Sequence, residues 1–191
     1  MIFALEGPRA VGKTTLLNNL ENLNPDIKVF PGYKYQGKSF DMTTFEGFCE
    51  NQKIYCQQKL RQYSELNDND INVVTRGTEN IIFFSLTYPQ IMGYNWNVIS
   101  ILQNELTELE AAKSDTIIYL DASNEVILAR SERDMRQRPN IQCWLELWSN
   151  EMRKFFLKQP RCIFIDTNFL TEVEVATEVL KRINDTCMTK I

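Results

Sequence analysis

The chain has 191 residues, of which 43% are hydrophobic and 24% charged, and its formal net charge is −4. This profile is typical of a globular domain of ordinary size that buries a substantial core. The negative charge argues against broad binding of polymeric nucleic acid, and no apolar run approaches the ~20 residues that a membrane-spanning helix needs. We therefore expect a single domain over residues 1–191, without linker, repeat or low-complexity tract.

The side chains that are rare or missing limit the chemistry. Five cysteines are present without a C-x-x-C pair, and histidine is absent. A disulfide framework or a zinc site is not expected, and free thiols suit a reducing compartment such as the cytoplasm. Without histidine, Ser-His and Cys-His nucleophile pairs are excluded. Acid–base chemistry must then fall to carboxylates, lysine, tyrosine or cysteine.

The most specific signal is a glycine-rich loop near the start of the chain. Residues 7–14 read Gly-Pro-Arg-Ala-Val-Gly-Lys-Thr, which matches G-x-x-x-x-G-K-[ST]. An apolar stretch at residues 2–5 precedes the loop, and leucines at helical spacing follow it. Strand, loop and helix together predict a phosphate-binding loop, in which Lys13 reaches the β- and γ-phosphates and the Thr14 hydroxyl ligates Mg²⁺. The expected nucleotide-binding residues are Gly7, Arg9, Ala10, Val11, Gly12, Lys13, Thr14 and Thr15.

A second strand and a long helix are predicted next. Residues 26–30 read as a short strand that Pro31 ends, and residues 32–40 as a loop with aromatic and lysine side chains. Such a loop either lines a ligand pocket or is simply exposed. Apolar residues at helical spacing predict a helix over residues 43–66. Gln52 lies within its apolar stripe, where either the protein or a ligand must satisfy the amide.

The middle of the chain predicts another strand followed by two helices. Residues 71–75 read as a strand that ends at Arg76. An apolar helix follows, and we expect Pro89 to close it. A further helix is predicted over residues 94–113, with its glutamates on a solvated face.

The last third continues the alternation of strands and helices. Residues 116–120 are the clearest buried strand, and they deliver Asp121 at its carboxyl end. A helix is predicted over residues 141–157, a fifth strand over residues 161–166 and a closing helix over residues 170–186. Strand and helix thus alternate five times, which predicts an α/β fold with a five-stranded parallel sheet flanked by helices in three layers.

Four arginines lie within nine residues after the fourth strand. A helix starting at residue 124 leads into Arg130, Arg133, Arg136 and Arg138. Guanidinium groups on a mobile lid can stabilise the charge of a transferring phosphoryl group, and closure of the lid excludes water. An exposed charged loop is the alternative interpretation of this segment, which spans about residues 130–140.

These features together resemble the deoxynucleoside kinases and thymidylate kinases. The resemblance rests on residues 3–15, the helix that contains Gln52, residues 74–77, residues 117–121 and the arginine cluster, in that order along the chain. It implies a P-loop fold and phosphoryl transfer from ATP, with Mg²⁺, to a small-molecule nucleoside or nucleoside monophosphate. By this resemblance Lys13, Arg76, Arg130 and Arg133 are catalytic, and Arg136 also holds the donor phosphates. The acceptor would be bound by Phe30, Tyr33, Gln52, Arg76 and Phe83. A homodimer is left open.

The chain departs from the family pattern at the acceptor side. Deoxynucleoside kinases carry Glu-Pro after the second strand, where this chain has Phe30-Pro31, and Glu-Arg-Ser after the third, where it has Thr75-Arg76-Gly77. Thymidylate kinases carry an acid in the phosphate loop, where this chain has Arg9. Arginines suit an anionic acceptor better than a neutral hydroxyl, so a monophosphate acceptor is slightly favoured.

Asp121 is the first candidate to replace the missing metal-organising acid, with Glu6 and Glu79 behind it. An acid at a strand end also commonly caps the next helix or orders the turn. A nucleotide-binding relative that acts through a partner, and a kinase for another small metabolite, remain alternative functions.

Overall fold

The computed structural model describes residues 1–32, 39–134 and 139–189. These residues form two compact units. The first, here called the sheet unit, comprises Met1–Pro31, Asp68–Thr75 and Asp115–Ile191. The second, here called the helical unit, comprises Gly32–Asn67 and Arg76–Ser114. The predicted site residues Tyr33 and Arg136 lie outside the described residues, as does most of the loop predicted over residues 32–40.

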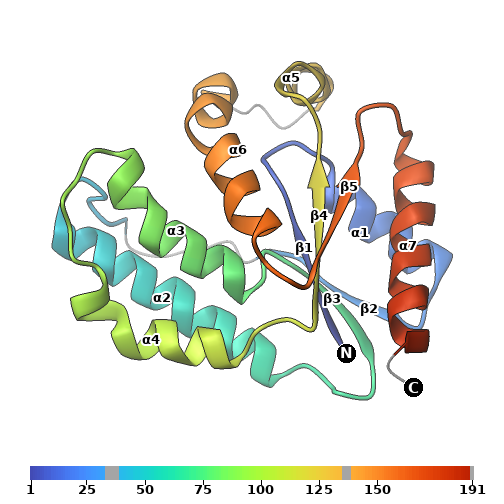
Figure 1. Cartoon of the computed structure of the whole chain (residues 1–191), viewed down its shortest axis with the longest axis horizontal. Coiled ribbons are helices and arrows are strands. Elements are labelled where there is room, and N and C mark those ends of the chain that lie inside the picture. Colours follow the sequence, from blue (N-terminus) through green and yellow to red (C-terminus); the bar gives the residue numbers. More distant parts are fainter. Residues whose placement is uncertain (33–38, 135–138, 190–191) are drawn as a thin grey trace. The chain divides into compact units, whose positions relative to one another are not determined.

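A five-stranded parallel sheet is the frame of the sheet unit (Figure 1). Its order is β2-β3-β1-β4-β5. The strands are β1 (Ile2–Glu6), β2 (Ile27–Phe30), β3 (Ile71–Thr75), β4 (Thr116–Asp121) and β5 (Cys162–Asp166). All five were predicted from the sequence, and the α/β fold class is confirmed. Because the strands are parallel, their carboxyl ends share one edge of the sheet, where the phosphate loop begins.

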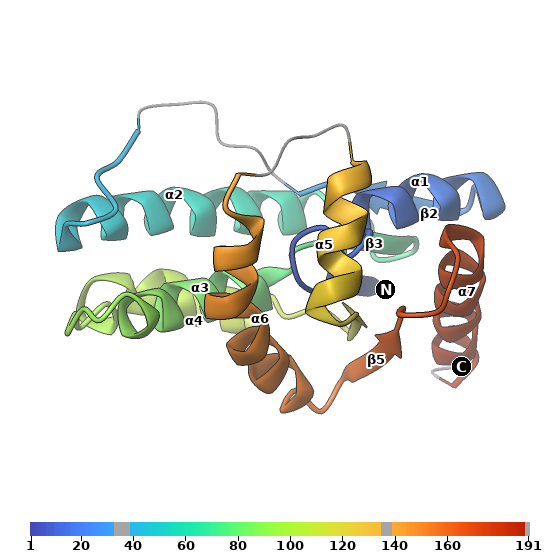
Figure 2. The same cartoon turned by 90° about the horizontal axis from the view of Figure 1, so that it is seen from above.

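Helices of the same unit cover both faces of β4. Ile118 and Leu120 belong to a core cluster that includes residues of α1 (Lys13–Leu23) and α7 (Glu172–Thr189). These two helices lie side by side in Figures 1 and 2. Tyr119 points the other way, and its ring lies 5.4 Å from that of Phe156 on α6 (Ile141–Leu157). The alternation of side chains along β4 therefore explains why the strand is buried on both faces.

The helical unit consists of α2 (Phe45–Ser64), α3 (Thr78–Ile91) and α4 (Ile99–Ala111). The stripe predicted on α2 is confirmed, since Phe48, Cys49, Gln52 and Cys56 are all buried. Phe48 stacks on Tyr88 of α3 with ring centroids 4.8 Å apart. No helix in the described part of the chain is both long and apolar enough to span a bilayer.

Two predicted helix boundaries are wrong. Pro89 does not close α3 but lies inside it, because the helix ends only two residues later and loses little from one missing N–H. The helix predicted from residue 94 begins at Ile99 instead. Tyr94 and Trp96 form a stacked pair 4.0 Å apart in the preceding segment, so their aromatic pattern reflects packing of that segment rather than a helix face.

Candidate functional site

The phosphate loop joins the end of β1 to the start of α1 in a conformation that glycine makes accessible. Gly7 has φ +132°, and a Cβ there would lie 2.2 Å from the backbone oxygen of Leu120. Gly12 is the N-cap of α1 with φ 112°. Ala10 also has a positive φ of 62°. The two motif glycines are thus required by backbone geometry, and Gly7 additionally by its approach to β4.

Lys13 closes the loop on itself. Its Nζ donates to the backbone oxygens of Gly7 and Pro8, each at 2.7 Å. Thr14 is exposed and Thr15 half-buried in the first turn of α1. The N-terminus of a helix favours anions, because its N–H groups point outward and its dipole is positive there. Loop, helix N-terminus and Lys13 are here called the phosphate cradle, because they bring together the donor groups that the sequence predicts for phosphate binding.

Arg9 lies at the tip of the loop over an aromatic ring. Its guanidinium carbon is 5.1 Å from the centre of the Trp144 ring on α6. Trp144 in turn stacks on Trp148, with centroids 6.5 Å apart. A guanidinium over an indole face is a cation–π contact. It connects the phosphate loop to the helix that follows the arginine cluster.

Of the predicted lid arginines, Arg136 and Arg138 lie outside the described residues, and Arg130 is more firmly anchored than Arg133. It lies on α5 (Asn124–Arg133), and its guanidinium donates to Thr167 Oγ1 at 2.9 Å, to the Thr167 backbone oxygen at 2.5 Å and to the Val11 backbone oxygen at 3.4 Å. Burial lowers the pKa of Arg130, although arginine remains charged. Arg133, one turn later, is exposed. Arg130 thus connects α5, the phosphate loop and the turn after β5.

Asp121, the predicted metal ligand, forms an ion pair. Its Oδ2 accepts from Nε and Nη2 of Arg153 on α6, at 2.7 and 2.6 Å. Burial raises the pKa of Asp121, and Arg153 opposes that rise. Ser123, not Asp121, caps α5 by accepting from the Val126 N–H at 3.4 Å. In this arrangement one carboxylate oxygen of Asp121 is already used.

The described residues assemble no group of three or more histidine, cysteine or acidic side chains that could hold a metal ion. Glu79, a weaker metal candidate, is 1% exposed and accepts from the backbone N–H and the hydroxyl of Ser114 at 3.0 and 3.1 Å. Glu6 is fully buried. Thr14 is exposed in the first turn of α1, and its role as a Mg²⁺ ligand stays a prediction.

Three predicted acceptor-site residues lie in the helical unit. Gln52 on α2 is 7% exposed, and its Oε1 accepts from the hydroxyl of Ser85 on α3 at 3.0 Å. Phe83 is buried on α3, next to Phe84. Arg76 is exposed with φ 56° and precedes Gly77, the N-cap of α3. The protein therefore satisfies at least part of the buried amide, which was one of the two alternatives.

Phe30 is the predicted acceptor residue that lies in the sheet unit. It is half-buried at the carboxyl end of β2, and its backbone oxygen accepts from Thr75 Oγ1 at 3.4 Å. The carboxyl edge of a parallel sheet is where ligands commonly bind, and the acceptor-binding role of Phe30 stays a prediction.

The sequence analysis missed Thr167, Arg153 and Ser85. Thr167 is fully buried, and both its N–H and its hydroxyl bond to the backbone oxygen of Asp121 at 2.8 Å. Its place after the fifth strand was a usable signal, because carboxyl strand ends line ligand sites. Arg153 and Ser85 carried no such signal, since each looks like an ordinary polar residue on an amphipathic helix.

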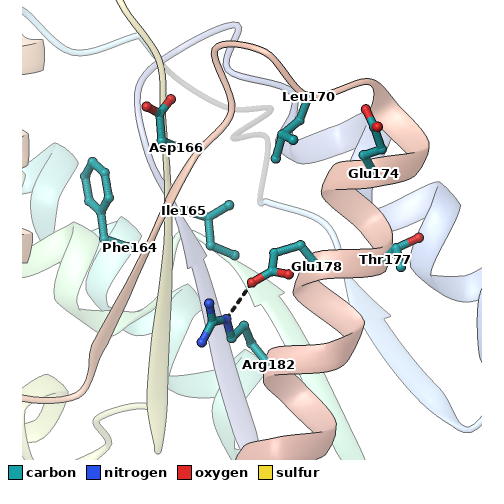
Figure 3. Close-up of a pocket in the computed structure, with 8 residues that line it drawn as sticks. All are labelled: Phe164, Ile165, Asp166, Leu170, Glu174, Thr177, Glu178 and Arg182. Atoms are coloured by element: carbon teal, nitrogen blue, oxygen red, sulfur yellow. Dashed lines mark hydrogen bonds and ion pairs between the residues drawn. The ribbon is translucent and has the colours of Figure 1, made fainter.

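A groove of about 490 Å³ lies between β5 and α7 (Figure 3). Ile165 and Leu170 point into it, and Glu178 pairs with Arg182 at 2.7 Å on its α7 side. None of its lining residues belongs to the phosphate loop. The groove and the phosphate cradle therefore share no residue.

The fold can be compared with solved structures, although no protein-family model and no curated protein matches the sequence. The thymidylate kinase of Candida albicans is similar with 16% identity and a TM-score of 0.58, over 97% of this chain and 91% of the other. A deoxyadenosine kinase from M. mycoides, solved with the products dCMP and dCDP, is similar with 15% identity and a TM-score of 0.69. That match covers 97% of this chain and 100% of the kinase. The chain has the fold of these kinases. The predicted P-loop kinase fold is therefore confirmed.

Proposed function

We propose that the chain is a kinase that transfers a phosphoryl group from ATP to a nucleoside monophosphate or a deoxynucleoside. The phosphate cradle is the observation on which this proposal rests. Its close approach to the Leu120 oxygen requires glycine at position 7, and the Lys13 ammonium group lies against the loop. The likeness to thymidylate kinase and deoxyadenosine kinase supports the same class of acceptor. The free cysteines suit action in a reducing compartment such as the cytoplasm.

The residues of the cradle have distinct roles in this proposal. Loop N–H groups and the start of α1 would bind the β-phosphate, and Lys13 would leave the Gly7 and Pro8 carbonyls for the phosphate oxygens. Mg²⁺ would be held through the Thr14 hydroxyl, and it neutralises charge on the phosphates when bound. Arg130 and Arg133 precede the remaining lid arginines and would add positive charge near the donor.

A monophosphate is the preferred acceptor. Arg9 and Thr75 stand where the related kinases carry acids, and Arg9 and the neighbouring Arg76 are both exposed. A phosphate acceptor is already anionic and needs positive charge, whereas a sugar hydroxyl gains typically 10²–10⁴-fold from a positioned base. Phosphorylation of thymidine should therefore be compared with that of its monophosphate. Turnover of the nucleoside alone would contradict the preference.

Lys13→Ala tests the donor site. We expect at least a hundredfold loss of kcat/KM with little change in the free energy of unfolding, because Lys13 donates to two backbone oxygens of the loop and is not part of the apolar core. Lys28→Ala is the matched control, since Lys28 is exposed and its Nζ reaches the Pro25 oxygen at 3.4 Å. Full activity of Lys13→Ala would show that the donor site is elsewhere.

A nucleotide-binding protein without turnover is the second candidate. It is favoured by the missing acceptor-site acids, and two candidates to replace them already have partners in the protein: Asp121 pairs with Arg153, and Glu79 accepts from Ser114. Thermal shift with ATP, Mg²⁺ and a panel of nucleosides and nucleotides separates the two. Stabilisation by ATP alone, without product, supports the second candidate. A panel of other phosphorylatable metabolites tests whether the acceptor is of another kind.

A further inference from the structure

Thr167 holds the Arg130 guanidinium through two acceptor atoms. Its hydroxyl oxygen accepts from Arg130 Nη1 at 2.9 Å, and its backbone oxygen accepts from Nη2 at 2.5 Å. The edge of the guanidinium that Nη1 and Nη2 form therefore faces Thr167. A guanidinium is a rigid, planar fork of N–H donors, so two contacts fix its orientation where a single contact would leave it free to turn.

The direction of the Thr167 hydroxyl is not ambiguous. It donates to the backbone oxygen of Asp121 at 2.8 Å, and a carbonyl oxygen can only accept. The one hydroxyl hydrogen is thus used, and the lone pairs of the oxygen remain for the Arg130 N–H. Because Thr167 is fully buried, its side chain can act on a ligand only through another residue.

The same turn also holds the beginning of α5. Asn168 Oδ1 accepts from the backbone N–H of Ser123, the N-cap of α5, at 2.8 Å. Arg130 lies near the other end of this helix, which ends at Arg133. Two successive residues after β5 therefore hold α5 close to both of its ends. A change at the Thr167 hydroxyl should then alter the orientation of the Arg130 side chain more than the position of the helix.

Part of the guanidinium is left for a ligand. In the described part of the chain, Arg130 Nη1 donates to Thr167 and to the Val11 backbone oxygen, and Nη2 donates to Thr167. The Nε–H and the second Nη2–H are parallel donors on the adjacent edge, of the kind that binds phosphate oxygens in a bidentate manner. Since Val11 belongs to the phosphate loop, the guanidinium lies next to the phosphate cradle.

We propose that Thr167 is a positioning residue that turns the Nε–Nη2 edge of Arg130 toward the phosphates of the donor nucleotide. The inference rests on the proposed function, in which Arg130 adds positive charge near the donor. A donor group that is already oriented needs no reorganisation when charge develops on the transferring phosphoryl group, so its orientation affects the rate. Without the Thr167 hydroxyl, the guanidinium keeps one contact with Thr167 and can pivot about it.

Thr167→Val tests this proposal, because it removes the hydroxyl and nearly keeps the size and shape of the side chain. The assay uses ATP and the member of the nucleoside and nucleotide panel that gives the highest turnover. We expect kcat at saturating ATP to fall about tenfold, the effect of one hydrogen bond to a charged group. Thr167→Ser keeps the hydroxyl and should stay within about threefold of the wild type.

Thr116→Val is the matched control. Thr116 is also buried in the sheet unit, but it lies at the amino end of β4, away from the edge where the phosphate loop begins. We expect it to leave kcat unchanged. Each variant is assayed at a temperature where circular dichroism shows it to be fully folded. Thr167→Ala, which removes the same hydroxyl, replaces Thr167→Val if that variant does not fold.

A double-mutant cycle separates positioning from a purely structural role. If Thr167 acts through Arg130, adding Thr167→Val to Arg130→Ala should lower kcat by less than about a further twofold. A purely structural threonine would instead lower the urea midpoint in both backgrounds and leave kcat of the folded protein unchanged.

The outcomes separate this inference from the proposed function. If the wild-type chain phosphorylates no member of the panel, the proposed function fails and the inference falls with it. If the chain is active but Thr167→Val keeps kcat within about twofold, or loses as much without Arg130 as with it, the inference alone is overturned. A loss in Thr167→Val that is absent in Thr167→Ser and disappears in the Arg130→Ala background supports it.

Discussion

Gly7 is constrained more strongly than its conformation alone requires. A Cβ at this position would meet the Leu120 oxygen at 2.2 Å, and that oxygen belongs to β4, which is paired on both sides in the sheet and cannot shift at low energetic cost. We expect Gly7→Ala to lower the free energy of unfolding by about 3 kcal/mol, from positive-φ strain and the clash together. Urea denaturation measures this change.

Gly12→Ala is the matched control for strain without a clash. Gly12 has φ +112°, but a Cβ there would meet nothing within 4 Å. The expected loss is only about 1–2 kcal/mol. Equal losses in the two variants would mean that the approach of β4 to the loop does not constrain Gly7.

The Asp121–Arg153 pair gives a prediction that depends on pH. In Arg153→Ala the buried carboxylate loses its partner, so the folded-state pKa of Asp121, already raised by burial, rises further. Because Arg153 is 37% exposed, we expect a loss of about 1–2 kcal/mol at pH 8. Unfolding by urea at a series of pH values measures it.

The sign of the pH dependence follows from the raised pKa. An acid that binds its proton more tightly in the folded state costs stability when it is ionised, so the cost is present above the folded pKa. It should shrink as the pH falls through that pKa toward the ordinary value of 3.8. Adding Asp121→Asn to Arg153→Ala should restore stability at pH 8 and remove the dependence. A loss that is constant with pH would contradict this account.

At the scale of elements, Arg130 is an anchor for α5 as well as a candidate for the donor site. Its guanidinium makes three hydrogen bonds to the Thr167 turn and the phosphate loop. We expect Arg130→Ala to lower the free energy of unfolding by about 1–2 kcal/mol without nucleotide, because these acceptors lose a charged donor. Arg133→Ala, on the same helix but exposed, should change it by less than 0.5 kcal/mol.

Activity then shows whether Arg130 also contacts phosphate. A lower kcat for Arg130→Ala, measured under conditions where the variant is fully folded and saturated with nucleotide, would support the catalytic role. An arginine that only anchors α5 would change the free energy of unfolding and the nucleotide affinity, but not kcat. Unchanged stability of Arg130→Ala would contradict the anchoring role that its contacts indicate.

The strands were predictable because each is a short apolar run at an abrupt change of composition. Strand β3 and helix α6 have the predicted bounds, 71–75 and 141–157, and β4 differs from its prediction by one residue. The predictions of two helix ends were wrong because each relied on a local pattern that has more than one structural cause. Pro89 breaks a helix only if enough helix remains beyond it, and Tyr94 and Trp96 mimic a helical stripe while stacking on each other.

At the scale of the whole molecule, the chain passes between the two units four times, at residues 31–32, 67–68, 75–76 and 114–115. The sequence predicts a single domain. Because neither unit is one continuous piece of chain, we expect them to unfold together in a single transition.

Tryptophans in each unit make this testable. Trp96 belongs to the helical unit, and Trp144 and Trp148 belong to the sheet unit. Urea unfolding of Trp96→Phe reports the sheet unit, and unfolding of a Trp144→Phe/Trp148→Phe chain reports the helical unit. In each variant, the urea midpoint from tryptophan fluorescence is compared with the midpoint from circular dichroism of the same variant. Agreement of the two midpoints in both variants supports one domain. Separate midpoints would show two independently folding units.

The phosphate loop was predictable because its chemistry is local, with every required residue within eight positions. The partners of Asp121, Gln52 and Arg130 were not, because Arg153, Ser85 and Thr167 lie 32 to 37 residues away in sequence. A sequence shows that a buried polar group needs a partner, but only the packing of helices against strands selects which one.

The contact between Arg9 and Trp144 makes tryptophan fluorescence a probe of the phosphate loop. An indole under a guanidinium emits differently from one whose face is uncovered, and the guanidinium here comes from the segment proposed to receive phosphate. Nucleotide arrival that draws Arg9 toward its phosphates would therefore be recorded in the intrinsic emission of Trp144. Because Trp144 is an intrinsic fluorophore next to the loop, binding of the donor nucleotide can be titrated without a label and without knowing the acceptor.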